Sequence, residues 1–163
     1  MKNALLFGLL LLIGFTSCKK DNDDGGGTTA QVITPGVGIT GLNLGDKAKV
    51  AIDLYGSVSP SYGASGGVYN HFLTYFSKGV IVYCEPTTDD TFNDQMLIGK
   101  ITLTAPYDGK TDKGIGIGST KAEVKTAYGD PVSSSSFFGD EYAIGITFVY
   151  EDGTEKVESI EIE

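Results

Sequence analysis

Apolar side chains alternate with polar or small ones near the C-terminus of the chain. The clearest run covers residues 142–150, where the apolar positions are Tyr142, Ile144, Ile146, Phe148 and Tyr150. A period of two places them on one face of a β-strand. Glu151-Asp152-Gly153 then predicts a turn, and Val157–Ile162 predicts a closing strand. Comparable patterns predict earlier strands over Val68–Phe76, Gly79–Cys84 and Met96–Leu103.

Two short segments carry helix signals instead. Asp46 and Thr120 are the expected N-caps, and Thr120 with Glu123 has the spacing of a capping box. Each helix is expected to end at a tyrosine-glycine pair, Tyr55-Gly56 or Tyr128-Gly129, because glycine suits the left-handed residue that follows a helix.

These signals recur at a spacing of 73 residues. Gly41-Leu42-Asn43-Leu44-Gly45 corresponds to Gly114-Ile115-Gly116-Ile117-Gly118, and Leu73-Thr74-Tyr75 corresponds to Ile146-Thr147-Phe148. An ordered series of matches indicates an internal repeat. We therefore expect an α+β fold of two tandem units, each a helix followed by an antiparallel meander, with the helices on one face of the sheet. Residues 31–163 would form a single domain, with repeats at about 39–105 and 106–163.

The N-terminus has the features of an export signal. Lys2 precedes the apolar segment Ala4–Gly14, which is too short to span a membrane as a helix. Phe15-Thr16-Ser17-Cys18 resembles the lipobox of bacterial lipoproteins, although Phe15 stands where leucine is usual. The resemblance implies that residues 1–17 are a signal peptide, that Cys18 is lipidated, and that the protein lies at the outer membrane. Residues 18–30 are acidic and glycine-rich, which predicts a flexible tether.

Charge excludes one class of partner. The net charge is −9, the removal of Lys2 would make it −10, and the chain has no arginine. Nucleic-acid binding depends on clustered cations that neutralise phosphates. We therefore expect neither nucleic-acid binding nor electrostatic binding to an anionic bilayer.

The second unit also resembles a known family. Gly118, Thr120 and Val124, then Tyr128-Gly129-Asp130-Pro131, precede the strand-turn-strand pattern of residues 146–162. This arrangement resembles the SmpA/OmlA outer-membrane lipoproteins and the related β-lactamase inhibitor protein (BLIP-like) fold, over roughly residues 39–85 and 110–163. The resemblance implies binding to other proteins, either in an assembly complex or as an inhibitor. It implies no catalytic residue.

Candidate catalytic groups are few. His71 is the chain's one histidine, and a partly buried, hydrogen-bonded structural role is expected for it rather than that of a catalytic base. Cys84 ends an apolar run and is expected to be a buried, unreactive thiol. Asp89, Asp90 and Asp94 lie in the segment Glu85–Gln95, where a solvated hairpin tip competes with a cation site. We expect no cofactor and no metal centre.

The preferred hypothesis is a non-enzymatic, membrane-anchored module that binds an unidentified envelope protein. Two alternatives remain, a structural subunit of an outer-membrane assembly complex and a hydrolase or glycan-active enzyme that uses segment 85–95. Strand alternation predicts that Phe72 and Phe76 point away from the helices, with Thr74 and Thr147 beside them. Exposed aromatic side chains are common anchors in protein interfaces, so these four residues are the predicted docking face.

Overall fold

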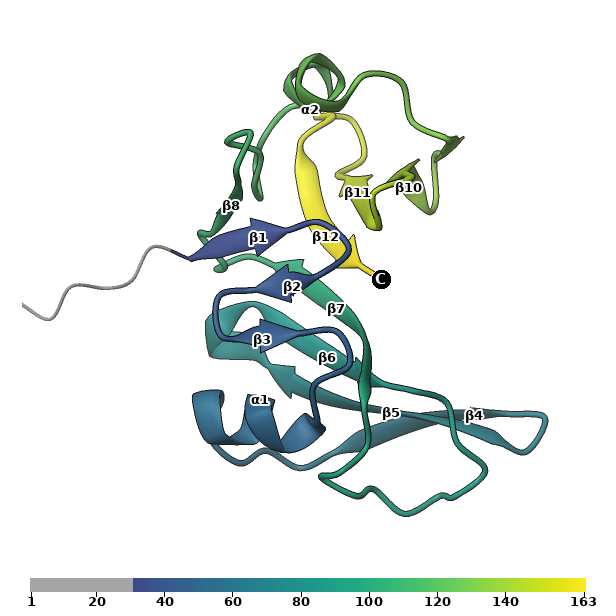
Figure 1. Ribbon diagram of the computed structural model, residues 1–163. Coiled ribbons are helices and arrows are strands. Elements are labelled where there is room, and N and C mark those ends of the chain that lie inside the picture. Colours follow the sequence, from purple (N-terminus) through teal and green to yellow (C-terminus); the bar gives the residue numbers. More distant parts are fainter. Residues whose placement is uncertain (1–30) are drawn as a thin grey trace, which may run out of the picture.

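A computed structural model describes residues 31–163, in which strands account for 44% and helices for 14% (Figure 1). The predicted signal peptide and tether, with Cys18, lie outside the described residues.

Eight antiparallel strands form the main sheet, in the order β4-β5-β6-β7-β12-β11-β10-β9. Their bounds are β4 Ser61–Ser65, β5 Val68–Tyr75, β6 Val80–Cys84, β7 Ile98–Thr104, β9 Ser133–Ser135, β10 Gly139–Tyr142, β11 Ile146–Tyr150 and β12 Val157–Ile162. The central pair is β7 with β12, in which Ile101 lies opposite Ile162 and Leu103 opposite Ile160. On each side of this pair the strands follow in reverse chain order toward the sheet edge, as β7-β6-β5-β4 on one side and β12-β11-β10-β9 on the other.

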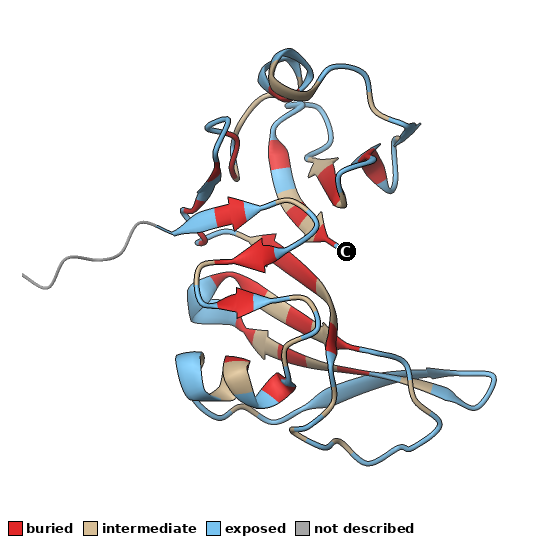
Figure 2. Cartoon of the chain, in the orientation of Figure 1, coloured by how far each residue is buried: buried red, intermediate tan, exposed pale blue. Residues whose placement is uncertain are grey.

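A second, smaller sheet has the order β3-β2-β1-β8. It comprises β1 Val32–Thr34, β2 Gly38–Ile39, β3 Leu42–Asn43 and β8 Lys110–Thr111, and β1 runs parallel to β8. In Figure 1 it lies across the middle of the main sheet, between the two helices. Ile33, Ile39 and Leu42 from this sheet join main-sheet side chains in one core cluster. Figure 2 shows buried stretches on strands of both sheets.

The two helices are α1 Ala48–Tyr55 and α2 Lys121–Tyr128. Both end at the predicted glycines, since Gly56 has φ 94° and Gly129 has φ 82°. The predicted capping box of Thr120 and Glu123 is confirmed. The N-cap predicted at Asp46 is wrong, because Lys47 takes that position and Asp46 accepts a hydrogen bond from the Asn43 amide at 2.8 Å.

The predicted fold class is wrong. The chain is mostly β, with two sheets, and is not a BLIP-like α+β repeat of helix and meander with helices on one face. The helices are too short to cover one face of so wide a sheet. A helix of eight residues is about 12 Å long, whereas eight strands extend over about 34 Å, so two such helices leave the middle of the face uncovered. Segment 32–43 covers that part of the face as strands.

The predicted strand over residues 142–150 is also wrong in detail. β10 ends at Tyr142 and β11 begins at Ile146, and the Gly145 amide donates to the Tyr142 carbonyl across the turn. Ile144, predicted to share a strand face with Ile146 and Phe148, lies in this turn and is 48% exposed. The register that matched Leu73–Tyr75 with Ile146–Phe148 is therefore displaced. Tyr128 contacts the rings of both Tyr142 and Phe148, with centroids 5.5 and 5.6 Å away, whereas Tyr55 contacts Tyr75 at 5.1 Å.

Candidate docking surface

One face of the main sheet packs in the core, and the opposite face carries the more exposed side chains. We call the opposite face the uncovered face. Strand register aligns one row of its residues across six strands, namely Thr74, Ile81, Thr102, Glu161, Thr147 and Glu141. On the core side, Leu73, Val82, Ile101 and Phe148 are 0% exposed. The sheet therefore has one face committed to folding and one available for contacts.

Aromatic and charged side chains are linked across the first half of this face. The ring of Phe72 lies 5.5 Å from that of Tyr83, and Lys100 Nζ lies 4.9 Å from the centre of the Tyr83 ring. Lys100 also forms an ion pair with Glu161 at 3.3 Å. These contacts leave Phe72 half-buried. They also fix the positions of the Phe72, Tyr83, Lys100 and Glu161 side chains relative to one another.

The four predicted docking residues do not all lie together. Phe72 and Thr74 are on the uncovered face, and Thr147 is on it too, but only 7% exposed. Thr147 is four strands away from Thr74, about 19 Å at the usual strand spacing. Phe76 is not on the sheet, because β5 ends at Tyr75 and Phe76 begins the 3-10 turn η1 Phe76–Lys78, where it is 84% exposed.

The sequence analysis missed two residues of this surface, Phe137 and Phe138. They form the tip of the hairpin between β9 and β10 and are 82% and 74% exposed. The available signal was their adjacency. Neighbouring residues of a strand point to opposite faces, so two consecutive phenylalanines after a run of serines cannot both enter one core. They line a hollow of about 500 Å³ on the uncovered face, together with Thr147 and Val149.

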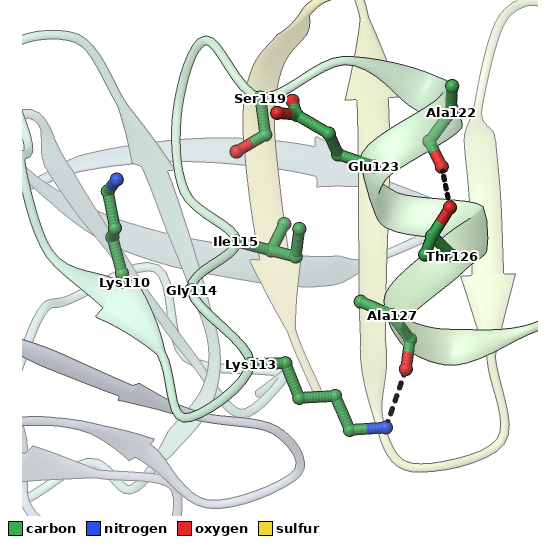
Figure 3. A pocket seen from close by; sticks show the side chains of 9 residues that line it. All are labelled: Lys110, Lys113, Gly114, Ile115, Ser119, Ala122, Glu123, Thr126 and Ala127. Atoms are coloured by element: carbon green, nitrogen blue, oxygen red, sulfur yellow. Dashed lines mark hydrogen bonds between the residues drawn. The ribbon is translucent and has the colours of Figure 1, made fainter.

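A larger hollow, of about 640 Å³, lies beside α2 (Figure 3). Two of its polar side chains already have structural partners. Lys113 Nζ donates to the Ala127 carbonyl at 2.7 Å and lies 4.5 Å from the Tyr128 ring centre. Glu123 accepts from the Thr120 amide, and this bond and that from the Thr120 hydroxyl lower the pKa of Glu123. These groups stabilise the two ends of α2.

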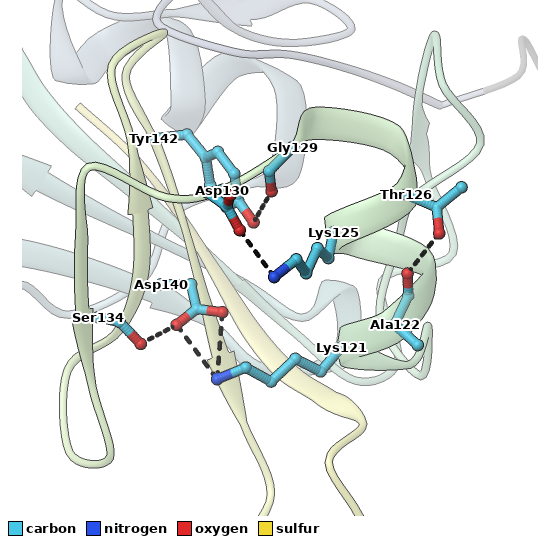
Figure 4. A network of polar contacts seen from close by, with 9 residues as sticks. All are labelled: Lys121, Ala122, Lys125, Thr126, Gly129, Asp130, Ser134, Asp140 and Tyr142. Atoms are coloured by element: carbon cyan, nitrogen blue, oxygen red, sulfur yellow. Dashed lines mark hydrogen bonds and ion pairs between the residues drawn. The ribbon is translucent and has the colours of Figure 1, made fainter.

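A buried carboxylate joins α2 to the edge of the main sheet (Figure 4). Asp140 is 2% exposed, and its two carboxylate oxygens each lie 3.2 Å from Lys121 Nζ. The Ser134 hydroxyl donates to the same carboxylate at 2.5 Å. Burial, and next the charge of Asp140, raises the pKa of Tyr150. This network holds β9, β10 and α2 together.

His71 has the structural role predicted for it. It is 1% exposed, and its Nε2 lies 2.9 Å from the Asp89 carbonyl oxygen. The rings of Tyr62, Tyr69 and Phe92 surround it, with centroids 5.7, 6.4 and 6.1 Å away. The imidazole therefore fixes segment 85–95 to β5.

The acidic segment is organised by its own hydrogen bonds. The Thr91 amide donates to Asp89 at 2.8 Å, the Thr91 hydroxyl donates to Asp90 at 3.2 Å, and the Gln95 side chain donates to Asp94 at 2.9 Å. Within residues 31–163, no group of three or more histidine, cysteine, aspartate or glutamate side chains is arranged to hold a metal ion.

The thiol of Cys84 is 4% exposed, and burial raises its pKa to about 11 from 9.0. The thiolate fraction at pH 8 should therefore be about 100-fold lower in the folded protein than in the unfolded chain. In a Cys18→Ser protein we expect a disulfide reagent to label Cys84 only after denaturation. Labelling of the folded protein at the rate of a free thiol would contradict this expectation.

The raised pKa of Cys84 also makes the stability of the fold depend on pH. Because ionisation of the thiol is disfavoured in the fold, its contribution to stability is complete below pH 9 and declines as pH rises through about 11.

No family model and no curated protein matches the chain. Two solved chains resemble it in structure. One is a cysteine-rich secretory protein from Staphylococcus aureus, with 14% identity and a TM-score of 0.43. The match covers 72% of this chain and 43% of that protein, so the chain spans less than half of its length. A similarity at this level carries no argument about function, and the expected relation to the SmpA/OmlA family stays a prediction.

No helix within residues 31–163 has the length and apolar character needed to cross a membrane.

Proposed function

We propose that the protein is a membrane-anchored, non-enzymatic module that binds another envelope protein through the uncovered face. The observation that carries this proposal is the difference between the two faces of the main sheet. One face has its apolar side chains in the core, and the other presents Phe72, Tyr83 and Ile81 half-buried, with the exposed Phe137 and Phe138 at its edge. Aromatic groups at the centre of a surface commonly dominate binding energy.

The position of β1 supports the choice of the uncovered face as the docking surface. The first described strand, β1, belongs to the small sheet, on the side opposite the uncovered face (Figure 1). The described residues therefore begin on the covered side, and β1 leaves the uncovered face accessible to a partner.

The enzymatic alternative receives less support from the described residues. His71 is enclosed by three aromatic rings and bonded to the backbone, and segment 85–95 uses its carboxylates in local turns. These groups act as structural elements. A scaffold role in an assembly complex needs the same docking surface and is a more specific form of the proposal.

The test compares two aromatic variants in the full-length protein. Phe72→Ser/Tyr83→Ser removes the ring pair of the uncovered face, and Phe76→Ser removes a phenylalanine that is exposed away from it. We expect the double variant to weaken co-purification of an envelope partner from detergent-solubilised membranes by at least about tenfold, and Phe76→Ser to have no effect. Thermal unfolding of each variant establishes that the retained protein is folded.

The proposal would be overturned if the folded Phe72→Ser/Tyr83→Ser protein kept its partner. It would also be overturned if Phe76→Ser weakened capture as much as the double variant did.

A further inference from the structure

The hairpin between β9 and β10 holds two phenylalanines in solvent in a defined conformation. The rings of Phe137 and Phe138 pack edge to face, with centroids 5.2 Å apart and an interplanar angle of 79°. Both backbone amides donate to the Ser135 hydroxyl, at 3.1 and 3.2 Å, which fixes the turn. Burying such side chains is favourable, so two rings ordered in solvent form an available contact surface.

Carboxylates surround this aromatic pair on two sides. The hollow of about 500 Å³ under the rings is lined by Glu141, Glu161 and Glu163. A second hollow, of about 370 Å³, shares Phe137 with the first and is lined by Glu151, Asp152 and Glu158. No lysine lines either hollow. Two lysines lie close by, since Lys100 pairs with Glu161 at 3.3 Å and Lys121 Nζ lies 4.8 Å from the ring centre of Tyr150, which lines the second hollow. Six carboxylates against these two lysines leave the surroundings of the aromatic tip negative.

We propose that this aromatic-acidic hollow binds an extended segment of a partner protein that carries lysine or arginine side chains. The inference rests on the proposed function and adds the chemistry of the partner. Phenylalanine rings attract a cation over their faces and pack against the aliphatic part of lysine or arginine. Glu141 and Glu163, which are exposed, can then pair with the charged ends.

An extended conformation follows from the edge of the sheet. β9 ends the main sheet, so one side of its backbone has no neighbouring strand in that sheet. Its residues Ser133–Ser135 carry no charge and no proline, two of the features that usually block the addition of a strand, although β9 is only three residues long. A partner strand added there would run beside the phenylalanines with its alternate side chains directed at the hollow.

Charge argues against two other occupants. A second copy of this chain, with a net charge of −9, would bring carboxylates toward carboxylates. A lipid surface would receive the rings only with the surrounding acids drawn toward it, which is unfavourable for an anionic membrane. Both occupants are outcomes of the experiment below.

The experiment measures binding of the full-length protein in detergent to a fluorescent, degenerate peptide library with lysine at every second position. A matched library with glutamate at those positions is the charge control. We expect the lysine library to bind with lower affinity at higher salt, and the glutamate library to show no binding. Phe137→Ser/Phe138→Ser and Glu141→Gln/Glu163→Gln should each weaken lysine-library binding by about tenfold.

Two matched variants make the result specific to the hollow. Phe76→Ser removes an equally exposed phenylalanine, and Asp90→Asn/Asp112→Asn removes the same amount of exposed charge elsewhere. Both should bind the lysine library as the unaltered protein does. Equal binding of the two libraries, or equal weakening by these controls, would overturn the inference.

The remaining outcomes assign the hollow to another occupant. If a Cys18→Ser protein sediments with lipid vesicles and no longer does so when Phe137 and Phe138 are changed to serine, the occupant is a lipid surface. If the same two changes remove self-association, the occupant is a second copy of the chain. Either result contradicts the proposal of a cationic partner segment. If the lysine library fails while Phe72→Ser/Tyr83→Ser still removes the envelope partner, this inference fails and the proposed function stands.

Discussion

Replacing Lys121 by methionine is expected to lower the free energy of unfolding by about 3 kcal/mol. The change leaves the Asp140 carboxylate buried, with its side chain 3% exposed, and retains only the hydrogen bond from Ser134 among the partners shown in Figure 4. The loss is large because a buried charge without a counter-charge has lost its hydration and gained little in return. Urea unfolding of the variant and of the unaltered protein measures the loss.

The matched control is Lys125→Met in the same helix. Lys125 pairs with Asp130 at 2.7 Å, but the two side chains are 66% and 80% exposed. Solvent screens such a pair, so we expect a far smaller loss than for Lys121→Met. Equal losses in the two variants would show that burial of Asp140 does not govern the stability of this edge of the sheet.

Gly79→Ala is expected to destabilise the fold on the order of 3 kcal/mol. Gly79 follows the η1 turn with φ 64°, and a methyl group there would overlap the Thr104 carbonyl oxygen and come within 2.6 Å of the Tyr107 amide nitrogen. Both obstacles are backbone atoms, so no side-chain rotation relieves the overlap. The β6–β7 pairing beside them should be displaced, and urea unfolding measures the cost.

Gly56→Ala is the control that separates the cost of an unfavourable positive φ from the cost of steric overlap with the added methyl group. Gly56 also has a positive φ, 94°, but an added methyl group there has no atom within 4 Å. We expect a loss of about 1 kcal/mol, because only the backbone conformation is unfavourable. A loss at Gly79 no larger than that at Gly56 would mean that the turn adjusts without cost.

Local signals predicted much of the secondary structure. The tyrosine-glycine pairs end both helices, Val157–Ile162 is a strand with the predicted bounds, and Gly79–Cys84 differs from β6 by one residue. These signals depend on neighbouring residues alone. The small sheet could not be predicted in the same way, because strands of two or three residues are too short to show a period of two. Its order, with β1 beside β8, is set by contacts between distant segments.

The candidate surface was predicted in part for a related reason. Alternation within β5 correctly placed Phe72 and Thr74 on the face away from the core, but it does not show where a strand ends. Phe76 was therefore assigned to a face that it does not share. Thr147 was placed beside Thr74 by a register that Gly145 breaks, since its φ of 75° turns the chain within the predicted strand. Phe137 and Phe138 lie on a hairpin tip, where their adjacency was the available signal and no longer alternation extends around them.

The most direct test of the central claim is photo-cross-linking in living cells. A photoreactive amino acid at Tyr83 or Val149 samples the uncovered face, and the same amino acid at Val37, which is 47% exposed in the turn between β1 and β2, samples the other side. The account predicts a covalent adduct with an envelope protein from Tyr83 and Val149 and none from Val37. An adduct from Val37 together with none from Tyr83 and Val149 would contradict it.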